Sequence, residues 1–392
     1  MKHYNFDEII DRQGTDCIKY DTLNVHFGRD GLLPLWVADM DFRTPDFITD
    51  AIRRRLDHPV FGYTCLTDDY YDGIIRWNKD LHNWDLQREW ISFVPGIVKA
   101  IACAVEFFTQ PGDKVIIQPP VYHPFRLVPQ NLNREVACNP LILRNGTYEM
   151  DFDNLESIID KRCKLLILSS PHNPAGIVWD KATLKQLAAI CHKHNIIVIS
   201  DEIHSEMVYP GYIHHPFPTV SQEASSCSVT FAAPSKTFNI AGIISSYAVI
   251  PDSSLRKRFY SFLKAGEFDQ GSMFSYIAAT AAYSPEGEEW RTQMIDYVVN
   301  NAKYIKEYIS NNIPEIKVFM PQASFLVWLD CRELGLSQKD LVGLFVDRAG
   351  LALNDGSIFG DGGAGFMRIN IGCPQATLKT AMHKLKEACT NN

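Results

Sequence analysis

Lys236 is the residue of this chain whose type and position best suit covalent chemistry. It lies in the stretch Ala233-Pro234-Ser235-Lys236-Thr237, between two apolar, β-type runs at 229–233 and 243–250. An amine at a strand end, in an apolar site, is easier to deprotonate than one in water. A neutral amine can condense with an aldehyde to form a Schiff base. The alternative is that Lys236 only caps a strand, and a lone Ser-Lys pair does not decide between the two.

Other polar residues follow apolar runs in the same way. Tyr122 comes after the run at 115–118, Asn173 after the run at 165–169, and Asp201 after the run at 196–200. In an open α/β sheet, ligands bind beyond the carboxyl ends of the strands. We therefore expect these side chains and Lys236 to converge on one crevice. Asn173 can also make an Asx turn before Pro174, and both interpretations can hold at once.

The elements that must position these residues alternate between strand and helix. The apolar runs are nearly continuous, as expected of strands covered on both faces. Helical patterns are predicted over 45–56, up to residue 77, and over 288–313. The alternation predicts an α/β fold in which a mostly parallel sheet is covered by helices, with a smaller α+β domain. We divide the chain into an N-terminal segment that contributes to the small domain, a large domain and a small C-terminal domain, over residues 1–48, 49–287 and 288–392.

A predicted helix that continues to residue 108 opens at Gly96. The N–H groups at Ile97 and Val98 would lack helical partners, and they point along the positive end of the helix dipole. Such a helix start can bind a phosphate group. On its own this signal is weak, because most helices begin without a ligand.

Composition narrows the class of protein. The 392 residues carry a net charge of -8, which argues against nucleic acid or an anionic membrane as the main partner. The first residues lack the apolar core of a signal peptide, and no run reaches membrane-spanning length. Ten scattered cysteines without a Cys-x-x-Cys pair predict free thiols, with no disulfide frame or zinc site. We expect a cytoplasmic protein.

Taken together, these motifs resemble the fold-type I enzymes of pyridoxal 5'-phosphate (PLP), the aspartate aminotransferase superfamily. Within it, the chain is most similar to the cystathionine β-lyase branch, which includes cystalysin and the MalY/PatB-type carbon-sulfur lyases. The resemblance covers essentially the whole chain. Asn173, Asp201 and Lys236 follow one another at spacings of 28 and 35 residues, and the matching strings are 36–42, 170–176, 200–204, 233–242 and 359–374.

The resemblance implies how the residues of the chain would hold PLP. Asp201 would stay ionised beside the protonated pyridine nitrogen, which keeps the cofactor an electron sink. Asn173 would donate to the phenolate oxygen of the ring, and Tyr122 would stack on the ring face. Four groups would hold the phosphate: the backbone of Ile97 and of Val98, the hydroxyl of Ser235, and Tyr63 of a second subunit in a homodimer.

The resemblance also assigns groups to the substrate. Arg368 would grip its carboxylate, a role suited to a permanently charged fork of donors, with help from the backbone at Ala38. His204 would lie near the cofactor ring, and a structural role and a catalytic role fit it equally well. Many aminotransferases have an arginine where this chain has Ile244, and the lyase branch shows the same lack.

The expected reaction is an α,β-elimination on L-cystathionine or a related L-amino acid with sulfur on its β-carbon, yielding thiol, pyruvate and ammonia. Lys236 would remove the α-proton, and Tyr122 or Lys236 would protonate the leaving thiolate. The alternatives are an aminotransferase that uses the same residues, and a non-catalytic PLP-binding regulator. The loop 209–215 could border the pocket or form a surface turn, and the sequence does not rank the two.

Overall fold

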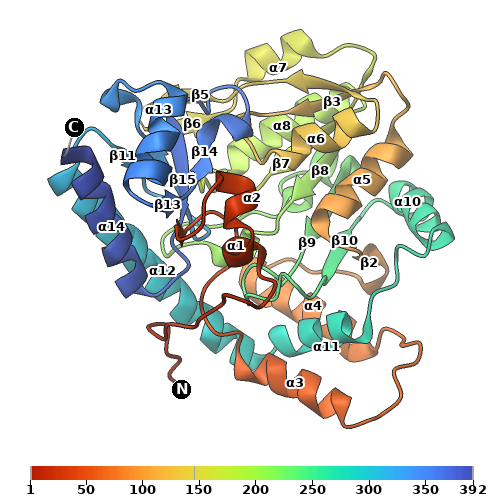
Figure 1. The fold of residues 1–392 in the computed structure, drawn as a ribbon. Coiled ribbons are helices and arrows are strands. Elements are labelled where there is room, and N and C mark those ends of the chain that lie inside the picture. The colour runs from red at the N-terminus through yellow and green to blue at the C-terminus, as the bar shows by residue number, and fades with distance from the viewer. Residues whose placement is uncertain (1, 145, 391–392) are drawn as a thin grey trace.

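The computed structural model of the protein describes residues 2–144 and 146–390. Its centre is a seven-stranded sheet in the order β2-β10-β9-β8-β7-β3-β4 (Figure 1). Strand β10 runs antiparallel to both of its neighbours, and the other pairs of this sheet are parallel. The strands are β2 (Ile91–Val94), β3 (Lys114–Ile117), β4 (Glu135–Cys138), β7 (Cys163–Ser169), β8 (Ile197–Asp201), β9 (Ser228–Ala232) and β10 (Ser246–Val249).

Alternating side chains bury both faces of this sheet. On β7, Leu165 and Ile167 pack into one core cluster, while Leu166 and Leu168 pack into another on the opposite face. The first face is covered by helices α5 (Ile97–Phe108), α6 (Pro124–Asn131) and α10 (Ser253–Ala265). The second is covered by α7 (Phe152–Ile158), α8 (Lys181–Lys193) and α9 (Gln222–Ser226). The predicted α/β fold with a mostly parallel sheet is confirmed.

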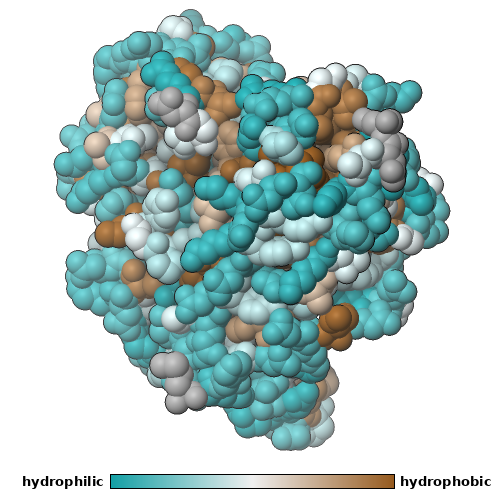
Figure 2. All heavy atoms as spheres, turned by 90° about the vertical axis from the view of Figure 1, so that its left-hand side faces the viewer, coloured by the Kyte–Doolittle hydropathy of each residue, from teal (hydrophilic) through white to brown (hydrophobic). Residues whose placement is uncertain are grey.

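A smaller antiparallel sheet of four strands forms beside the large one, in the order β11-β12-β15-β14. Its elements and neighbours are β11 (Lys317–Phe319), β12 (Leu326–Asp330), β14 (Asn354–Asp355), β15 (Phe366–Asn370), α13 (Gln338–Gly343) and the hairpin of β5 (Ile142–Arg144) with β6 (Thr147–Glu149). The long helix α12 (Pro285–Asn312) packs along α14 (Gln375–Thr390) (Figure 1). The outer face of this region is largely hydrophilic, with small hydrophobic patches between (Figure 2). It is the smaller α+β part that the sequence predicts.

The N-terminal segment joins this smaller part. Strand β1 (Leu33–Pro34) pairs in parallel with β13 (Leu351–Ala352). The contribution of residues 1–48 to a small domain, and the boundaries at 48 and 287, remain a prediction. The remaining helices are α1 (Ile18–Asp21), α2 (Leu23–Phe27), α3 (Asp46–Leu56), α4 (Asp68–His82) and α11 (Met273–Ala282). Short 3₁₀ or π turns are η1 (Arg88–Trp90), η2 (Ser205–Met207), η3 (Phe217–Thr219), η4 (Arg332–Leu334), η5 (Leu344–Arg348) and η6 (Gly356–Phe359).

The predicted strand at 243–250 is shorter than its apolar run suggests. Strand β10 begins only at Ser246, and residues 241–245 form an irregular turn. The Ser275 hydroxyl donates to the carbonyl of Ile244 at 2.6 Å, which satisfies a backbone group that a strand would have paired. The helix predicted at 45–56 is confirmed by α3. Among the described residues, no helix combines the length and apolarity needed to cross a membrane.

Candidate active site

A cavity of ≈ 180 Å³ opens where the central strands end. The parallel strands β7, β8 and β9 bring their carboxyl ends to one edge of the sheet, and the cavity lies beyond that edge. Nearly every residue that the sequence predicted for the site lines it. The lining comprises Ala38, Gly96, Ile97, Val98, Tyr122, Ser169, Asn173, Asp201, Ile203, His204, Ser235, Lys236, Ala241, Ile244, Ser245 and Ser246.

Asp201 is the last residue of β8 and lies opposite Ser169 of β7 in the sheet register. Its side chain is buried, and the backbone N–H of Ile203 donates to it at 3.1 Å. Burial raises the pKa of Asp201 to about 7, while the bond from Ile203 and the charge of Lys236 oppose the rise. A carboxylate in this position is short of a positive partner, so it suits a ligand that brings a protonated nitrogen.

Lys236 lies in the turn that follows β9. Its Nζ donates to the backbone carbonyl of Ala38 at 2.6 Å. Burial lowers the pKa of Lys236 below its usual range, although the negative charges of Asp39 and Asp201 act against the decrease. The amine therefore loses its proton more readily than a surface lysine, which is what a nucleophile or a general base requires.

Arg368, on β15 of the small sheet, lies behind the cavity wall and not in its lining. Its guanidinium donates to three oxygens: the side chain of Asn173 at 2.9 Å, the carbonyl of Trp36 at 3.1 Å and the side chain of Asn354 at 2.5 Å. Its Nε is buried without a partner, and burial lowers the pKa of Arg368 to about 10. Within the described part of the chain, no carboxylate forms an ion pair with it. A buried cation of this kind calls for an anionic ligand.

The start of helix α5 forms another wall of the cavity. Gly96 precedes it with a φ of 101°, and no side chain caps the helix. The first backbone N–H groups, at Ile97 and Val98, therefore face the cavity without a capping acceptor. The hydroxyl of Ser235 lines the same cavity, and the Ser245 hydroxyl is buried without a hydrogen-bond partner. These donors fit a phosphate group.

Two rings contribute to the remaining wall. Tyr122 follows β3, and its backbone N–H donates to the carbonyl of Asn173 at 3.1 Å, which ties two parts of the site together. Burial raises the pKa of Tyr122, so its hydroxyl keeps its proton at neutral pH. Burial also lowers the pKa of His204 to about 3, helped by the charges of Lys236 and Arg368, and its Nδ1 has no partner. His204 is therefore neutral.

Tyr63 is far more exposed than these residues. It lies in the segment 59–67, which forms no helix or strand, and its side chain is fully exposed. It does not line the cavity of its own chain. The predicted role of Tyr63 in a second subunit stays a prediction.

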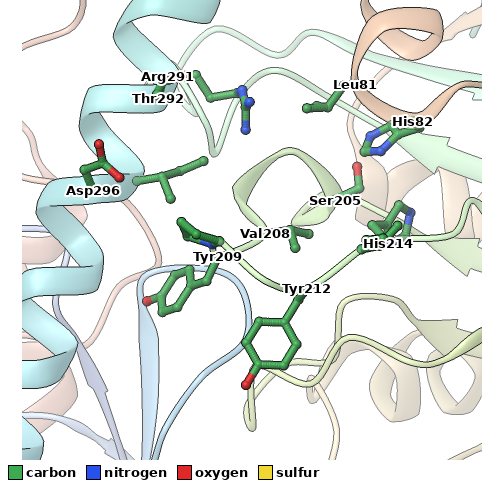
Figure 3. Close-up of a pocket in the computed structure, with 13 residues that line it drawn as sticks. Leu81, His82, Ser205, Val208, Tyr209, Tyr212, His214, Arg291, Thr292 and Asp296 are labelled. Atoms are coloured by element: carbon green, nitrogen blue, oxygen red, sulfur yellow. The ribbon is translucent and has the colours of Figure 1, made fainter.

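A wider hollow of ≈ 300 Å³ lies elsewhere, between α4, α12 and the loop after β8 (Figure 3). The loop predicted to border either the pocket or the surface lines this hollow, through Tyr209, Tyr212 and His214. Two of its lining side chains have ionic partners: Glu202 binds His214 Nε2 at 2.8 Å, and Glu288 binds Arg291 at 2.7 Å. None of the predicted site residues lines this hollow, whereas most of them line the smaller cavity.

Several groups of the site were not found from sequence. Asn354 holds Arg368, and Asn239 holds the segment before α3 through bonds to Met40 and Phe42. Ser245 lies in the run that the sequence assigned to a strand. An isolated Asn or Ser gives no pattern, and only the fold shows which of them meet the site.

Comparisons with known proteins agree with this geometry. The family description "aminotransferase class I and II" matches residues 32–385. Cystathionine beta-lyase PatB of Bacillus subtilis (strain 168) is 41% identical over 385 residues, which cover 98% of this chain and 99% of that protein. The crystal structure of cystalysin from Treponema denticola, which contains a PLP cofactor, matches with a TM-score of 0.96 and 35% identity, over 100% of both chains.

A third comparison is a PLP-bound C-S lyase from Staphylococcus hominis, crystallised with the inhibitor L-cycloserine. It matches with a TM-score of 0.92 and 32% identity, over 99% of this chain and 100% of that one. The sequence match, the fold and the convergence of Lys236, Asp201 and Asn173 on one cavity point the same way. The chain belongs to the class I and II aminotransferase family.

Proposed function

We propose that the protein is a PLP-dependent carbon-sulfur β-lyase. Its substrate would be L-cystathionine or a related sulfur-containing L-amino acid, cleaved by α,β-elimination to a thiol, pyruvate and ammonia. The observation that carries the proposal is that one cavity is lined both by the part-buried Lys236, whose amine has a lowered pKa, and by the buried carboxyl group of Asp201. The similarity of nearly the whole chain to PatB, cystalysin and the C-S lyase supports the lyase reaction.

The described residues fit PLP. The N–H groups of Ile97 and Val98 and the hydroxyl of Ser235 would hold its phosphate, since they are hydrogen-bond donors that line the cavity. Asp201 would face the pyridine nitrogen, whose proton relieves the cost of burying the carboxylate. Asn173 uses its side-chain oxygen on Arg368, so its NH₂ group is left to donate to the ring oxygen. Tyr122 and His204 would contact the ring.

When bound, PLP supplies an electron sink for the electron pair left on the substrate α-carbon. Lys236 would act as the base that takes the α-proton. Its lowered pKa leaves a larger neutral fraction at neutral pH than an ordinary lysine has, and the Ala38 carbonyl holds its nitrogen in place.

Arg368 would bind the substrate carboxylate, with help from the backbone at Ala38. Its unpartnered Nε and its lack of a carboxylate partner in the described chain support this assignment. For the leaving thiolate, both Tyr122 and Lys236 are candidate proton donors. The Tyr122 hydroxyl is protonated at neutral pH because burial raises its pKa. Lys236 carries the proton that it has just removed.

We further propose that the enzyme works as a cytoplasmic homodimer. The exposed Tyr63, on a segment that also exposes Val60 and Phe61, is available to reach the phosphate site of a partner subunit. Exposed apolar groups in one segment are typical of an interface. All ten cysteines are free thiols, which suits a reducing compartment.

The alternative function is that of an aminotransferase, which the family also contains. It would use Lys236, Asp201 and Arg368 in the same way but would not expel sulfur. Ile244 in the cavity wall supports the lyase, because many aminotransferases have an arginine at this position.

A single incubation separates the two. The holoenzyme is given L-cystathionine without any keto acid, and pyruvate, ammonia and thiol are measured. The lyase releases all three in equal amounts, whereas an aminotransferase stops after the first half-reaction because no keto acid accepts the amino group. Lys236→Ala serves as control and should lose at least about 1000-fold in rate. If the variant loses the absorbance of the lysine-bound cofactor but keeps full elimination, Lys236 is not the base; absence of elimination in both proteins favours the aminotransferase or the non-catalytic regulator.

A further inference from the structure

Residues 36–42, here called the strap, cross the active site as irregular backbone. Their carbonyls meet the two cationic groups of the site: Trp36 accepts from Arg368, and Ala38 accepts from Lys236. Side chains from distant elements fix the strap. Asn370 donates to the carbonyls of Val37 and Asp39, both at 2.6 Å, while Asn239 binds Met40 and Phe42. The position of each carbonyl therefore depends on what holds the strap.

Four charged side chains form a cluster around the two acids of the strap, Asp39 and Asp41. Arg12 binds Asp39 at 2.6 Å and Asp41 at 2.7 Å. Lys19, on α1, binds Asp41 at 2.8 Å and lies 3.7 Å from Asp39. Arg12 also donates to the Met40 carbonyl at 3.1 Å, and Lys19 to the Asp39 carbonyl at 3.4 Å. The cluster is neutral as a whole, with two positive and two negative charges.

This cluster is costly to bury. The side chain of Lys19 is 0% exposed and that of Asp41 is 6% exposed. Burial alone would lower the pKa of Arg12, yet its bonds to Asp39 and Asp41 raise it, so Arg12 stays charged. Apolar side chains often replace buried ion pairs without loss of stability, so stability alone gives little reason for a four-membered cluster. A better reason for the cluster is that it fixes the backbone geometry of the strap.

We propose that Arg12, Lys19, Asp39 and Asp41 are positioning residues for the reaction: they lock the strap so that the Ala38 carbonyl holds the amine of Lys236 at the reacting centre. This inference rests on the proposed function of Lys236 as the base. It also accounts for the two acids of the strap, neither of which lines the cofactor cavity. The cluster acts through the strap and touches neither substrate nor cofactor.

The charges of the cluster also affect the protonation of Lys236. The charges of Asp39 on the strap, Asp201 on β8 and Arg368 on β15 all act on the pKa of Lys236, while the nearby His204 is neutral. Asp39 favours the protonated amine, whereas Arg368 disfavours it. Arg12 and Lys19 offset the charge of Asp39, so they also limit how strongly it holds the proton on Lys236.

The first test measures the strap itself, by hydrogen exchange of the purified holoenzyme analysed by peptide mass spectrometry. Lys19→Met leaves two acids on one arginine, so exchange in peptides that contain 37–42 should rise by at least about tenfold. Lys19→Met/Asp41→Asn restores the charge balance and should recover much of the protection. Lys193→Met is the matched control: Lys193 forms an exposed pair with Glu156 at 2.9 Å, far from the site. Unchanged strap exchange in folded Lys19→Met overturns the proposal.

The second test measures Lys236 in the full chain freed of cofactor, as the pH profile of its acylation by an amine reagent. Asp39→Asn keeps the shape of the side chain and removes its charge, so the midpoint should fall by about one pH unit. Asp39→Asn also tests the proposal if Lys19→Met does not fold. An unaltered profile in Asp39→Asn overturns the electrostatic part. Neither readout involves turnover, so a failure of the lyase assay with both results intact would refute the proposed function alone.

Discussion

At the scale of single residues, the site is built from charged groups that lack partners of opposite charge. Arg368 is buried with neutral oxygens around it, and Asp201 is buried with one backbone donor. Burying either charge without an opposite one is costly, and a ligand that brings the opposite charge offsets this cost. The two residues therefore favour a ligand that brings a negative charge to Arg368 and a positive charge to Asp201.

For Arg368, the prediction concerns substrate affinity. Arg368→Lys keeps the charge but removes the fork of donors, so kcat/KM should fall by about 100-fold, or about 3 kcal/mol. Most of the loss should appear in KM, because the carboxylate is bound in both the ground state and the transition state. Steady-state kinetics check this, with Arg332→Lys, an exposed arginine paired with Asp330, as the matched control. An unchanged KM would assign the carboxylate to another group.

For Asp201, the prediction concerns pH. The folded-state pKa near 7 lies above the ordinary value of 3.8, so the folded, cofactor-free protein binds an extra proton between these values. Its stability therefore falls as the pH rises through this window. Asp201→Asn removes the effect, so its advantage over the unchanged protein should grow from pH 4 to pH 8, up to about 4 kcal/mol. Thermal melts of both proteins across this range measure it; a constant difference would contradict the raised pKa.

At the scale of elements, strand ends were predictable because continuous apolar runs stop where the sheet does. Asn173 and Asp201 were placed this way. Strand β8 ends at Asp201, and Asn173 follows the end of β7 at Ser169. The run at 243–250 was not predicted correctly, since apolar residues such as Ile244 also line cavities. Nor could the sequence show that Asn354 would hold Arg368, because a lone asparagine on another strand carries no pattern.

The start of α5 gives a prediction about an element. Gly96 has a positive φ, and a Cβ there would lie 3.4 Å from the Ile244 side chain. Gly96→Ala should destabilise the fold by about 1–3 kcal/mol. It should also weaken cofactor binding by about tenfold, because the helix start moves away from the phosphate. Gly335→Ala, also at positive φ but in open space at the end of a turn, should lower stability without changing cofactor affinity in titrations.

At the scale of the whole molecule, the fold could be predicted from alternating elements, while the assembly could not be read from one chain. Tyr63 is the residue on which the proposed homodimer depends, and its own cavity does not contain it. A role across subunits differs from a surface role in one respect. Only if Tyr63 acts in the partner's site can two inactive variants combine into a mixed dimer that has one active site.

Mixing variants tests this. Tyr63→Ala and Lys236→Ala are each expected to be nearly inactive. After subunit exchange in equal amounts, about half of the dimers would be mixed, each with one complete site, so activity should return to about a quarter of the unmutated value. Activity that stays absent, with exchange verified by native mass spectrometry, would place Tyr63 outside the partner's site.

The contacts of Arg368 have a consequence for synthesis of the protein. Its guanidinium is held by Trp36, Asn173 and Asn354, which come from the beginning, the middle and the end of the sequence. A chain still emerging from the ribosome completes β8 and β9, and with them Asp201 and Lys236, long before β15 is made. Such a nascent chain contains Lys236 but still lacks Arg368, and it lacks Asn370, which holds the strap that Lys236 contacts. The proposed carboxylate-binding site therefore forms only after the last strand has been made.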